Sequence, residues 1–477
     1  MLRPTQSPIV FIQQLGRGLR KAEDKEYVVI VDFIGNYKNN FMIPIALSGD
    51  RSYNKDNVRH YVMEGSRIIP GSSTIHFDEI SRKQIYQAID NANFSDLKLI
   101  KENYFNLKNK LGHIPRLEEF DQYGEMDVCR IFDNKSLGSY YKFLFKYDKE
   151  YTVRLNDEEE KIIEFISKKI VNGKRVHELE LLSLMIHHNH GLIGKLQNNL
   201  QEKYGIILND DSIQNIINIM TNEFPTGSAR KTYKECVFIE QEKNPKIFEE
   251  LQTEQLHRNM ETRMTAYAQN WLSKHIEYGV SAPLKEMLHN SDFLTILEDL
   301  INFGKARYER DYSNRYQDTD FVLYQKYTYE DVCRLLNWEN NEVPLNIGGY
   351  KFDKRTKTFP VFINYDKADN ISDTTKYEDH FVSNNQLIAI SKSGRSLESE
   401  DVQNFLHARE KNIDVQLFVR KNKDDKISKE FYYLGRMTAT GEAKEFVMPN
   451  TEKTAVEILW TLDVPVKEDL YEYITSE

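Results

Sequence analysis

Two arginines near the start of the sequence have the type and spacing needed to contact a triphosphate. They are Arg17 and Arg20 in the stretch QQLGRGLR, and on a helix they share one face with Gln13, while Gly16 allows another backbone to approach closely. A guanidinium is planar and permanently charged, so it can donate paired hydrogen bonds to phosphate oxygens. In phosphoryl transfer such arginines stabilise the charge that develops on the γ-phosphate. The simpler alternative is a solvated basic helix face.

A helix and a strand must position these arginines. Ser7 can cap a helix and Pro8 suits its first position, and apolar residues then follow at helical spacing. Residues 27–37, YVVIVDFIGNY, form a continuous apolar run that closes on polar residues and a glycine. This pattern is typical of a strand buried in a parallel sheet. We therefore predict a helix and then a buried strand at the start of the chain.

The string QQLGRGLR resembles motif VI of superfamily 2 helicases, Gln-x-x-Gly-Arg-x-x-Arg, carried here by Gln13, Gly16, Arg17 and Arg20. The resemblance implies that residues 1–77 are the end of a second RecA-like α/β domain and that Arg17 and Arg20 act as arginine fingers. No phosphate-binding loop of the type Gly-x-x-x-x-Gly-Lys-Ser/Thr and no DEAD-like run occurs in the sequence. We expect ATP and Mg²⁺ to serve a longer protein, and this fragment alone to need no cofactor and to be catalytically inactive.

Residues 78–320 are expected to form an α-helical coupler. Segments such as residues 158–170, 211–224 and 293–311 place an apolar stripe opposite a charged face, as in helical bundles. Basic groups on these helices, Lys108, Lys110 and Arg116, either touch DNA or lie on solvated faces.

Two further sets of residues in the sequence are read as structural. His187, His188 and His190 cluster beside a predicted helix end, but no neighbouring Asp, Glu or Cys completes a usual ligand set, so we predict no metal site. Three well separated cysteines are interpreted as core residues of a reducing compartment: Cys129, Cys236 and Cys333.

The bulk composition is that of an ordinary globular protein. Of 477 residues, 40% are hydrophobic and 29% charged, and the net charge is −10. This acidic balance argues against a protein that coats DNA uniformly, but it permits DNA binding through local basic patches. No apolar stretch is long enough to span a membrane, so we expect a cytoplasmic protein without a membrane partner.

Residues 321–477 change to short, alternating segments rich in Tyr, Phe, Val and Thr, which indicate strands. Two hairpins are predicted, within residues 348–367 and within residues 415–437, with a helix at residues 399–410 between them. We expect a β-rich, barrel-like domain.

One segment between the hairpins combines groups suited to DNA. The loop SKSGRS offers hydroxyls and cations for phosphate contact through Ser391, Lys392, Ser393 and Arg395. Just before it, aromatic rings that could stack on an extruded base lie next to carboxylates that could accept from an exocyclic amine, at Tyr377, Glu378, Asp379 and Phe381. The alternative is that these aromatics are core and the loop is merely solvated.

The order of motif VI, helical middle and a tail containing RLLNW, GGYKFD, SKSGRSLES and FYYLGRM resembles type IV, modification-dependent restriction enzymes. The resemblance implies ATP-dependent cleavage of double-stranded DNA that carries 5-methylcytosine or 5-hydroxymethylcytosine. The tail would then read the modified base, through an SRA-like fold that flips it, and FYYLGRM adds Tyr432, Tyr433 and Arg436 to the candidate DNA-binding residues. A phospholipase D-like nuclease and the first RecA-like domain would be supplied in cis by a missing N-terminal half, and a homodimer is a further partner.

Two other functions stay open. The tail could be a protein-interaction or oligomerisation module. Its affinity for a protein partner would then depend less on salt than an affinity for DNA does. It could also hold a nuclease site, although Asp353, Asp366 and Lys367 match such a constellation only loosely.

Overall fold

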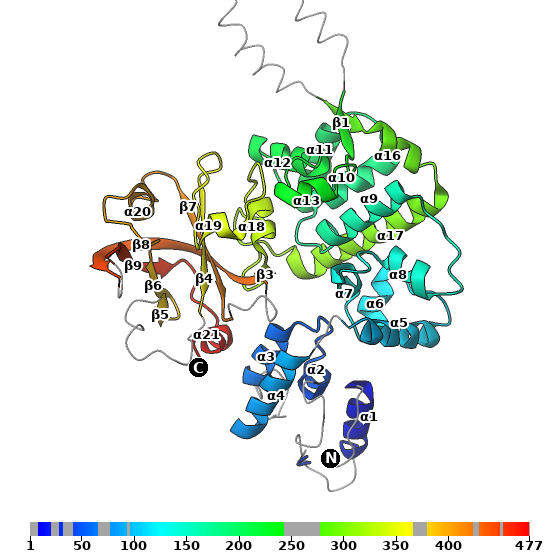
Figure 1. Cartoon of the computed structure of the whole chain (residues 1–477), viewed down its shortest axis with the longest axis horizontal. Helices are drawn as coiled ribbons and strands as arrows, with labels where there is room; N and C mark the ends of the chain where they lie inside the picture. Colours follow the sequence, from blue (N-terminus) through cyan, green and yellow to red (C-terminus); the bar gives the residue numbers. More distant parts are fainter. Residues whose placement is uncertain are drawn as a thin grey trace, which may run out of the picture.

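The computed structural model of the chain describes residues 8–20, 28–31, 42–64, 77–92, 96–242, 277–365, 379–422, 429–448 and 452–476. Helices fill the first two thirds of the described chain, and a large sheet dominates the last third (Figure 1). The protein is therefore a mixed α and β structure. Among the described residues, no helix has both the length and the apolar character needed to cross a membrane.

The regular elements described in the N-terminal segment are helices. Its elements are α1 (Pro8–Gly18), α2 (Met42–Ser48), α3 (Lys55–Glu64) and α4 (Glu79–Asn91). The predicted helix is confirmed as α1. The predicted buried strand is wrong for residues 28–31, because they join no sheet and Val29 is 76% exposed. A parallel strand needs neighbours on its edges and cover on both faces, and none of the described N-terminal residues provides another strand. Residues 27 and 32–37 lie outside the described residues.

The helical character predicted for residues 78–320 is confirmed, because the described residues there form a packed set of helices. The set contains α5 (Leu97–Leu111), α6 (Leu117–Tyr123), α7 (Cys129–Asp133), α8 (Tyr140–Tyr147), α9 (Asp157–Lys169), α10 (His177–His187), α11 (Leu192–Tyr204), α12 (Asp210–Met220), α13 (Gly227–Thr232), α16 (Ala282–Met287), α17 (Ser291–Arg307) and the π-helical turn η3 (Tyr308–Tyr312). A short antiparallel pair, β1 (Ile239–Gln241) and β2 (Tyr278–Val280), lies beside them.

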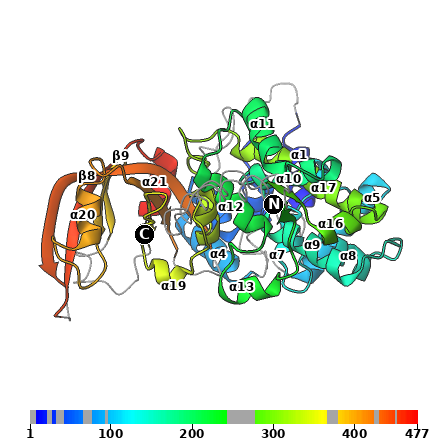
Figure 2. The same ribbon diagram turned by 90° about the horizontal axis from the view of Figure 1, so that it is seen from above.

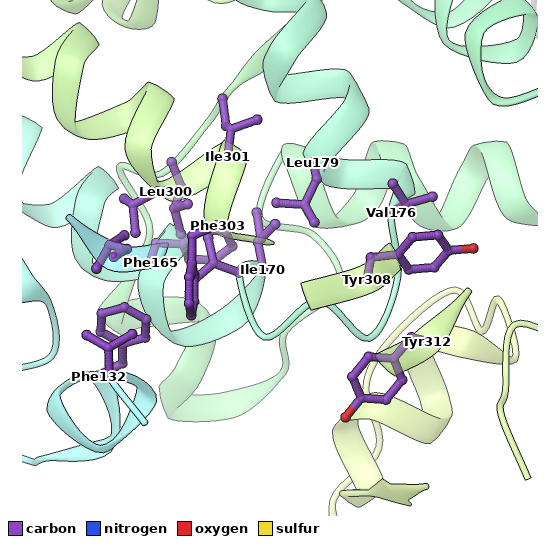
Figure 3. Close-up of a cluster of buried hydrophobic side chains, with 14 of the residues drawn as sticks. Phe132, Phe165, Ile170, Val176, Leu179, Leu300, Ile301, Phe303, Tyr308 and Tyr312 are labelled. Carbon is purple, nitrogen blue, oxygen red and sulfur yellow. The ribbon is translucent and has the colours of Figure 1, made fainter. Parts of the chain in front are cut away.

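Local signals set the boundaries of these helices. Asn156 and Glu159 form a capping box at the start of α9, which satisfies backbone N–H groups that lack a partner within the helix. Helix α5 ends where Gly112 adopts a left-handed conformation, with φ of 78°. The helices then bury one shared core, to which α7, α9, α10 and α17 contribute aromatic and aliphatic side chains (Figure 3).

The C-terminal part is built on a seven-stranded mixed sheet. Its strands are β3 (Lys326–Tyr327), β4 (Thr358–Asn364), β5 (His380–Ser383), β6 (Gln386–Ile390), β7 (Asp414–Arg420), β8 (Phe431–Val447) and β9 (Thr454–Leu462). They follow the order β4-β7-β8-β9-β6-β5, with β3 paired to β8; β4 and β7 run parallel, and the other pairs are antiparallel. The part also holds α18 (Tyr329–Leu335), α19 (Pro344–Ile347), α20 (Glu400–Leu406) and α21 (Glu468–Thr475).

The barrel-like expectation for this part is wrong in the described residues, because the outer strands β4 and β5 do not pair and the sheet stays open. Irregularities in the pairing of β8 curve the sheet without closing it; one lies at Gly435, with φ of 90°, and another beside Gly441. Figure 2 shows the long, bent course of β8 and β9. The predicted second hairpin is confirmed as β7–β8, and the predicted helix between the hairpins is confirmed as α20.

Both faces of the central strands are covered. Along β8, Phe431 and Tyr433 join the core of the helical part, whereas Tyr432 and Leu434 join a second core beneath α20 and α21. Adjacent residues of a strand point to opposite faces, so neither face of β8 is open to solvent in this stretch.

The helical part and the sheet part share a core and a buried polar network. The hydrophobic cluster of the helical part continues into Phe362 and Phe418 of the sheet. The guanidinium of Arg175, which is 1% exposed, donates to the backbone oxygen of Arg334 at 2.8 Å across the boundary near residue 320. Separate domains are therefore not confirmed, since the expected boundary runs through a continuous interior.

Candidate nucleic-acid interface

We call residues 391–396 the cationic loop. It connects β6 to α20 and is held against β9: the backbone N–H of Gly394 donates to the oxygen of Thr454 at 2.8 Å, and Ser391 exchanges hydrogen bonds of 2.8 Å with the backbone of Val456. Gly394 has φ of 81°, a left-handed conformation that glycine adopts without strain. These hydrogen bonds fix the backbone of the loop and thereby the positions of its side chains.

Tyr350 organises the cations of this loop. Its hydroxyl accepts from the backbone N–H of Lys392 at 2.9 Å and donates to a carboxylate oxygen of Asp401 at 2.8 Å. The Lys392 ammonium lies 4.7 Å from the centre of the Tyr350 ring, which is a cation–π contact. Arg395 pairs with Asp401 at 2.7 Å, and its side chain remains 40% exposed.

The cationic loop concentrates positive charge. Burial lowers the pKa of the Lys392 ammonium and the positive charges of Arg395 and Lys351 lower it further, while the negative charge of Asp401 acts in the opposite direction. Among the described residues no carboxylate contacts the Lys392 Nζ. Ser393 and Gly394 are exposed at the tip, so a bound anion would have access to hydroxyl and backbone donors as well as cations. The arrangement can bind a phosphate group.

The residues predicted to read a base are not assembled into a pocket. Tyr377 and Glu378 lie outside the described residues. Asp379 accepts the backbone N–H of Ile390 at 2.7 Å, which uses one of its carboxylate oxygens to fix the start of the hairpin. Phe381 is 7% exposed and packs on neighbouring rings of the C-terminal core.

The two tyrosines of FYYLGRM are core residues rather than stacking faces. Tyr432 is 5% exposed and donates to Asp56 at 2.7 Å, while Tyr433 is fully buried. The reason is that β8 is covered on both faces, and the unbroken aromatic and apolar run of residues 431–434 is the local signal of such burial. Arg436 forms ion pairs with Asp414 and Asp318, both at 2.7 Å, so its charge is largely compensated within the sheet.

The motif VI residues lie on the open side of α1. Phe11 is 4% exposed and joins the core with residues of α2, whereas Gln13, Gly16, Arg17 and Arg20 are exposed. A methyl group built on Gly16 would meet no atom within 4 Å. This surface could therefore be approached closely by another protein domain.

A large polar cavity, which no local motif indicated, lies where the three parts of the chain meet. We call it the junction cleft. Its volume is about 1470 Å³, and its walls come from the start of α3, from α7 and α9, and from β3 and α18. Ten lysines and arginines and seven acidic residues line it, although acidic residues outnumber basic ones in the chain as a whole. Its residues are far apart in sequence, which is why spacing could not identify it.

Most cations of the junction cleft are already paired. Lys174, at its centre, contacts Asp331 and Glu430, each at 2.7 Å. Arg307 contacts Asp127 at 2.8 Å. A buried ion that is compensated in this way has little charge left for a ligand. Arg395 of the cationic loop is paired in the same way, with Asp401, so the loop differs from the cleft in its exposed tip and in Lys392, which pairs with no carboxylate among the described residues.

The remaining candidates of the sequence have local partners. Lys108 contacts Asp148 and Glu150, both at 2.8 Å, and Lys110 donates to the backbone of Tyr123 at 3.1 Å. Arg116 is exposed at the start of α6.

The three histidines near residue 190 are all exposed, and His190 pairs with Glu242 at 2.6 Å. Asp353 accepts from the Thr356 hydroxyl at 3.1 Å, while Asp366 and Lys367 lie outside the described residues. All three cysteines carry free thiols; Cys236 and Cys333 are buried and Cys129 is partly buried.

Two stretches of the chain resemble known protein families. Residues 321–474 match a family described as a domain of unknown function, DUF3427, and residues 100–312 match a second domain of unknown function, DUF8090. No curated protein matches the chain. The chain thus resembles one uncharacterised family over most of its sheet part and another over most of its helical part, and neither description names an activity.

Proposed function

We propose that this chain recognises DNA and that the cationic loop contacts the DNA backbone. The observation that carries the proposal is the geometry of the loop: the Lys392 ammonium lies over the Tyr350 ring at 4.7 Å and pairs with no carboxylate among the described residues, and the Arg395 side chain stays 40% exposed beside Asp401. Like charges held together at a partly buried position repel, and a phosphate between them would relieve that repulsion. Each such contact releases counterions from DNA, which makes binding depend on salt.

The finer proposal is that the bound DNA carries 5-methylcytosine or 5-hydroxymethylcytosine and that the chain serves an ATP-dependent restriction enzyme. Its support is the resemblance of the sequence to modification-dependent restriction enzymes and the exposure of the motif VI arginines on α1. An SRA-like mode of base flipping belongs to the same proposal. The residues proposed to contact the base are Tyr377, Glu378 and Asp379, because Phe381, Tyr432 and Tyr433 are buried.

Fluorescence anisotropy of the whole chain with a labelled duplex tests the DNA contact. Replacing Lys392 and Arg395 by Gln should weaken binding and reduce the slope of log K against log salt by about 2, because roughly 0.9 counterions are released per phosphate contact. Lys467→Gln is the matched control, since Lys467 is exposed on the same part of the chain but lies at the start of α21. Unchanged binding in the Lys392 and Arg395 variants would refute the role of the loop.

The same assay with methylated and unmethylated duplexes tests base reading. One buried methyl group contributes about 0.8 kcal/mol, which corresponds to roughly fourfold tighter binding. Equal affinities would refute the reading of 5-methylcytosine and leave the phosphate contact standing. Absence of DNA binding together with concentration-dependent self-association would favour the oligomerisation module instead.

The motor role of α1 makes a separate prediction. Arginine fingers act on a triphosphate that another domain holds, and the sequence contains no phosphate-binding loop of its own. The purified chain should therefore release no phosphate from ATP. Measurable ATPase activity that survives Arg17→Ala would contradict this assignment.

A further inference from the structure

Three potential metal ligands meet where the N-terminal segment packs on the end of the chain. His60 and Glu64 lie one turn apart on α3, and Asp469 lies in the first turn of α21. One ligand atom from each residue falls within 4.8 Å of the other two, and no other such group occurs among the described residues. Helices α3 and α21 lie side by side in Figure 1.

The His60 ring is fixed, and one of its nitrogens is uncommitted. The ring stacks on Tyr473 with centres 4.6 Å apart and meets Tyr432 edge to face at 6.2 Å. Its Nε2 lies 3.2 Å from Glu64 Oε1, yet this buried atom makes no hydrogen bond of normal geometry. The in-plane direction of Nε2 is thus not taken by a protein partner, which is the state a metal ligand requires.

The carboxylates of Glu64 and Asp469 form no ion pair with a cation other than His60 among the described residues. A carboxylate oxygen of Asp469 lies within 4.8 Å of one of Glu64, and no Lys or Arg among the described residues forms an ion pair with either group. Two carboxylates this close repel unless a proton or a cation lies between them. The junction cleft offers a contrast, because its central carboxylates, Asp331 and Glu430, share Lys174.

From this geometry we infer that His60, Glu64 and Asp469 bind a divalent transition metal, with Zn²⁺ the best match. One imidazole and two carboxylates are a ligand set that Zn²⁺ accepts, at bond lengths of about 2.0–2.2 Å. Tetrahedral ligands at such bond lengths lie roughly 3.3 Å apart. The His60–Glu64 separation of 3.2 Å already meets this value, and a modest movement of the third ligand completes the set.

The bound metal would link helix α3 of the N-terminal segment to α21, the last helix of the described chain. Its ligands come from α3, which follows the motif VI helix, and from α21, which closes the sheet part. The inference does not depend on the proposed DNA contact, because the cationic loop contributes no ligand.

Equilibrium dialysis of the whole chain against Zn²⁺, with metal content measured by mass spectrometry, tests the site. We expect one Zn²⁺ per chain after prior treatment with EDTA. Glu64→Gln and Asp469→Asn keep the side-chain shape but remove a charged ligand, and each should weaken binding by more than about tenfold. His113→Gln is the control, since His113 also pairs with a glutamate, Glu119, but has no third ligand within reach.

Thermal unfolding gives a second readout that separates ligand loss from misfolding. Zn²⁺ should raise the midpoint of the wild-type chain and of His113→Gln, because a ligand that binds only the folded state stabilises it. Without metal, the midpoint of Glu64→Gln shows whether the variant is folded, and Zn²⁺ should no longer shift that midpoint. Absence of stoichiometric Zn²⁺, or Zn²⁺ binding that both variants retain, would overturn the inference.

Discussion

Replacement of Arg175 by Met should destabilise the helical part and the sheet part together. The Arg175 side chain is fully buried and bonds Glu178, itself fully buried, through two of its nitrogens. It also donates to Asn215 of α12 at 2.8 Å, and to Arg334 and Asn337 beyond residue 320. The substitution leaves the Glu178 carboxylate buried without this partner.

The size of the effect follows from Glu178. Burial alone would raise the pKa of this carboxyl, but the charges of Arg175 and Arg334 overcome burial and lower the pKa to about 2. Relative to an ordinary value near 4.5, this shift corresponds to about 3 kcal/mol of stability at neutral pH. Breaking a buried ion pair costs roughly 3–5 kcal/mol. We therefore expect Arg175→Met to lower the free energy of unfolding by about 3–5 kcal/mol at pH 7.

Lowering the pH should reduce the difference in free energy of unfolding between wild type and Arg175→Met. The contribution of a carboxyl with a lowered pKa is present above its unfolded pKa and is lost as pH falls toward its folded value. In wild type the loss runs from about pH 4.5 down to about pH 2. In the variant, the buried carboxylate gains a proton more readily and recovers stability, so wild type and variant should differ less at pH 4 than at pH 7.

Urea unfolding followed by far-ultraviolet circular dichroism and by tryptophan fluorescence measures both effects. Circular dichroism reports mainly on the helices, whereas tryptophan fluorescence follows Trp460 of the sheet core together with Trp338, which belongs to the core of the helical part. Arg230→Ala is the control, because its pair with Glu223 is about half exposed and should contribute less than about 1 kcal/mol. A loss below 1 kcal/mol, or a sheet transition that does not shift, would refute the reasoning. So would a double variant, Arg175→Met with Glu178→Leu, that is no more stable than the single one.

Three further substitutions test other parts of the fold by the same unfolding assay. Burial raises the pKa of Asp299 to about 6, so its charged form lowers the free energy of unfolding increasingly as pH rises from about 4 to 6. Asp299→Asn should therefore raise the free energy of unfolding by up to about 3 kcal/mol at pH 8 and by little near pH 4. A lower free energy of unfolding at pH 8 would contradict this prediction. Gly304→Ala should cost about 1–3 kcal/mol, because the new methyl would lie 2.6 Å from a Leu179 carbon where α17 crosses α10; unchanged stability would show that Leu179 moves aside freely. Phe405→Ala should cost about 3–5 kcal/mol, since its ring stacks on Phe359 with centres 4.0 Å apart, and a cost below 1 kcal/mol would show that this core relaxes.

The sequence by itself determined the local elements. The spacing of apolar residues predicted α9, α12 and α17, because helix formation depends on side chains within a few residues of one another. Alternation around a short polar stretch predicted the β7–β8 hairpin for the same reason. The exposed arginines of α1 and the cationic loop were also identified locally, since each lies within a single short segment.

Only the tertiary structure decided what those elements face. Tyr432 and Tyr433 carry aromatic rings that could stack on a base, but cores on both faces of β8 bury them, and part of that cover comes from helices far away in sequence. The parallel pairing of β4 with β7 and the open edges of the sheet likewise depend on how distant strands meet. His60 and Asp469 are separated by most of the chain, so their approach depends on the packing of α3 on α21 and on no local pattern.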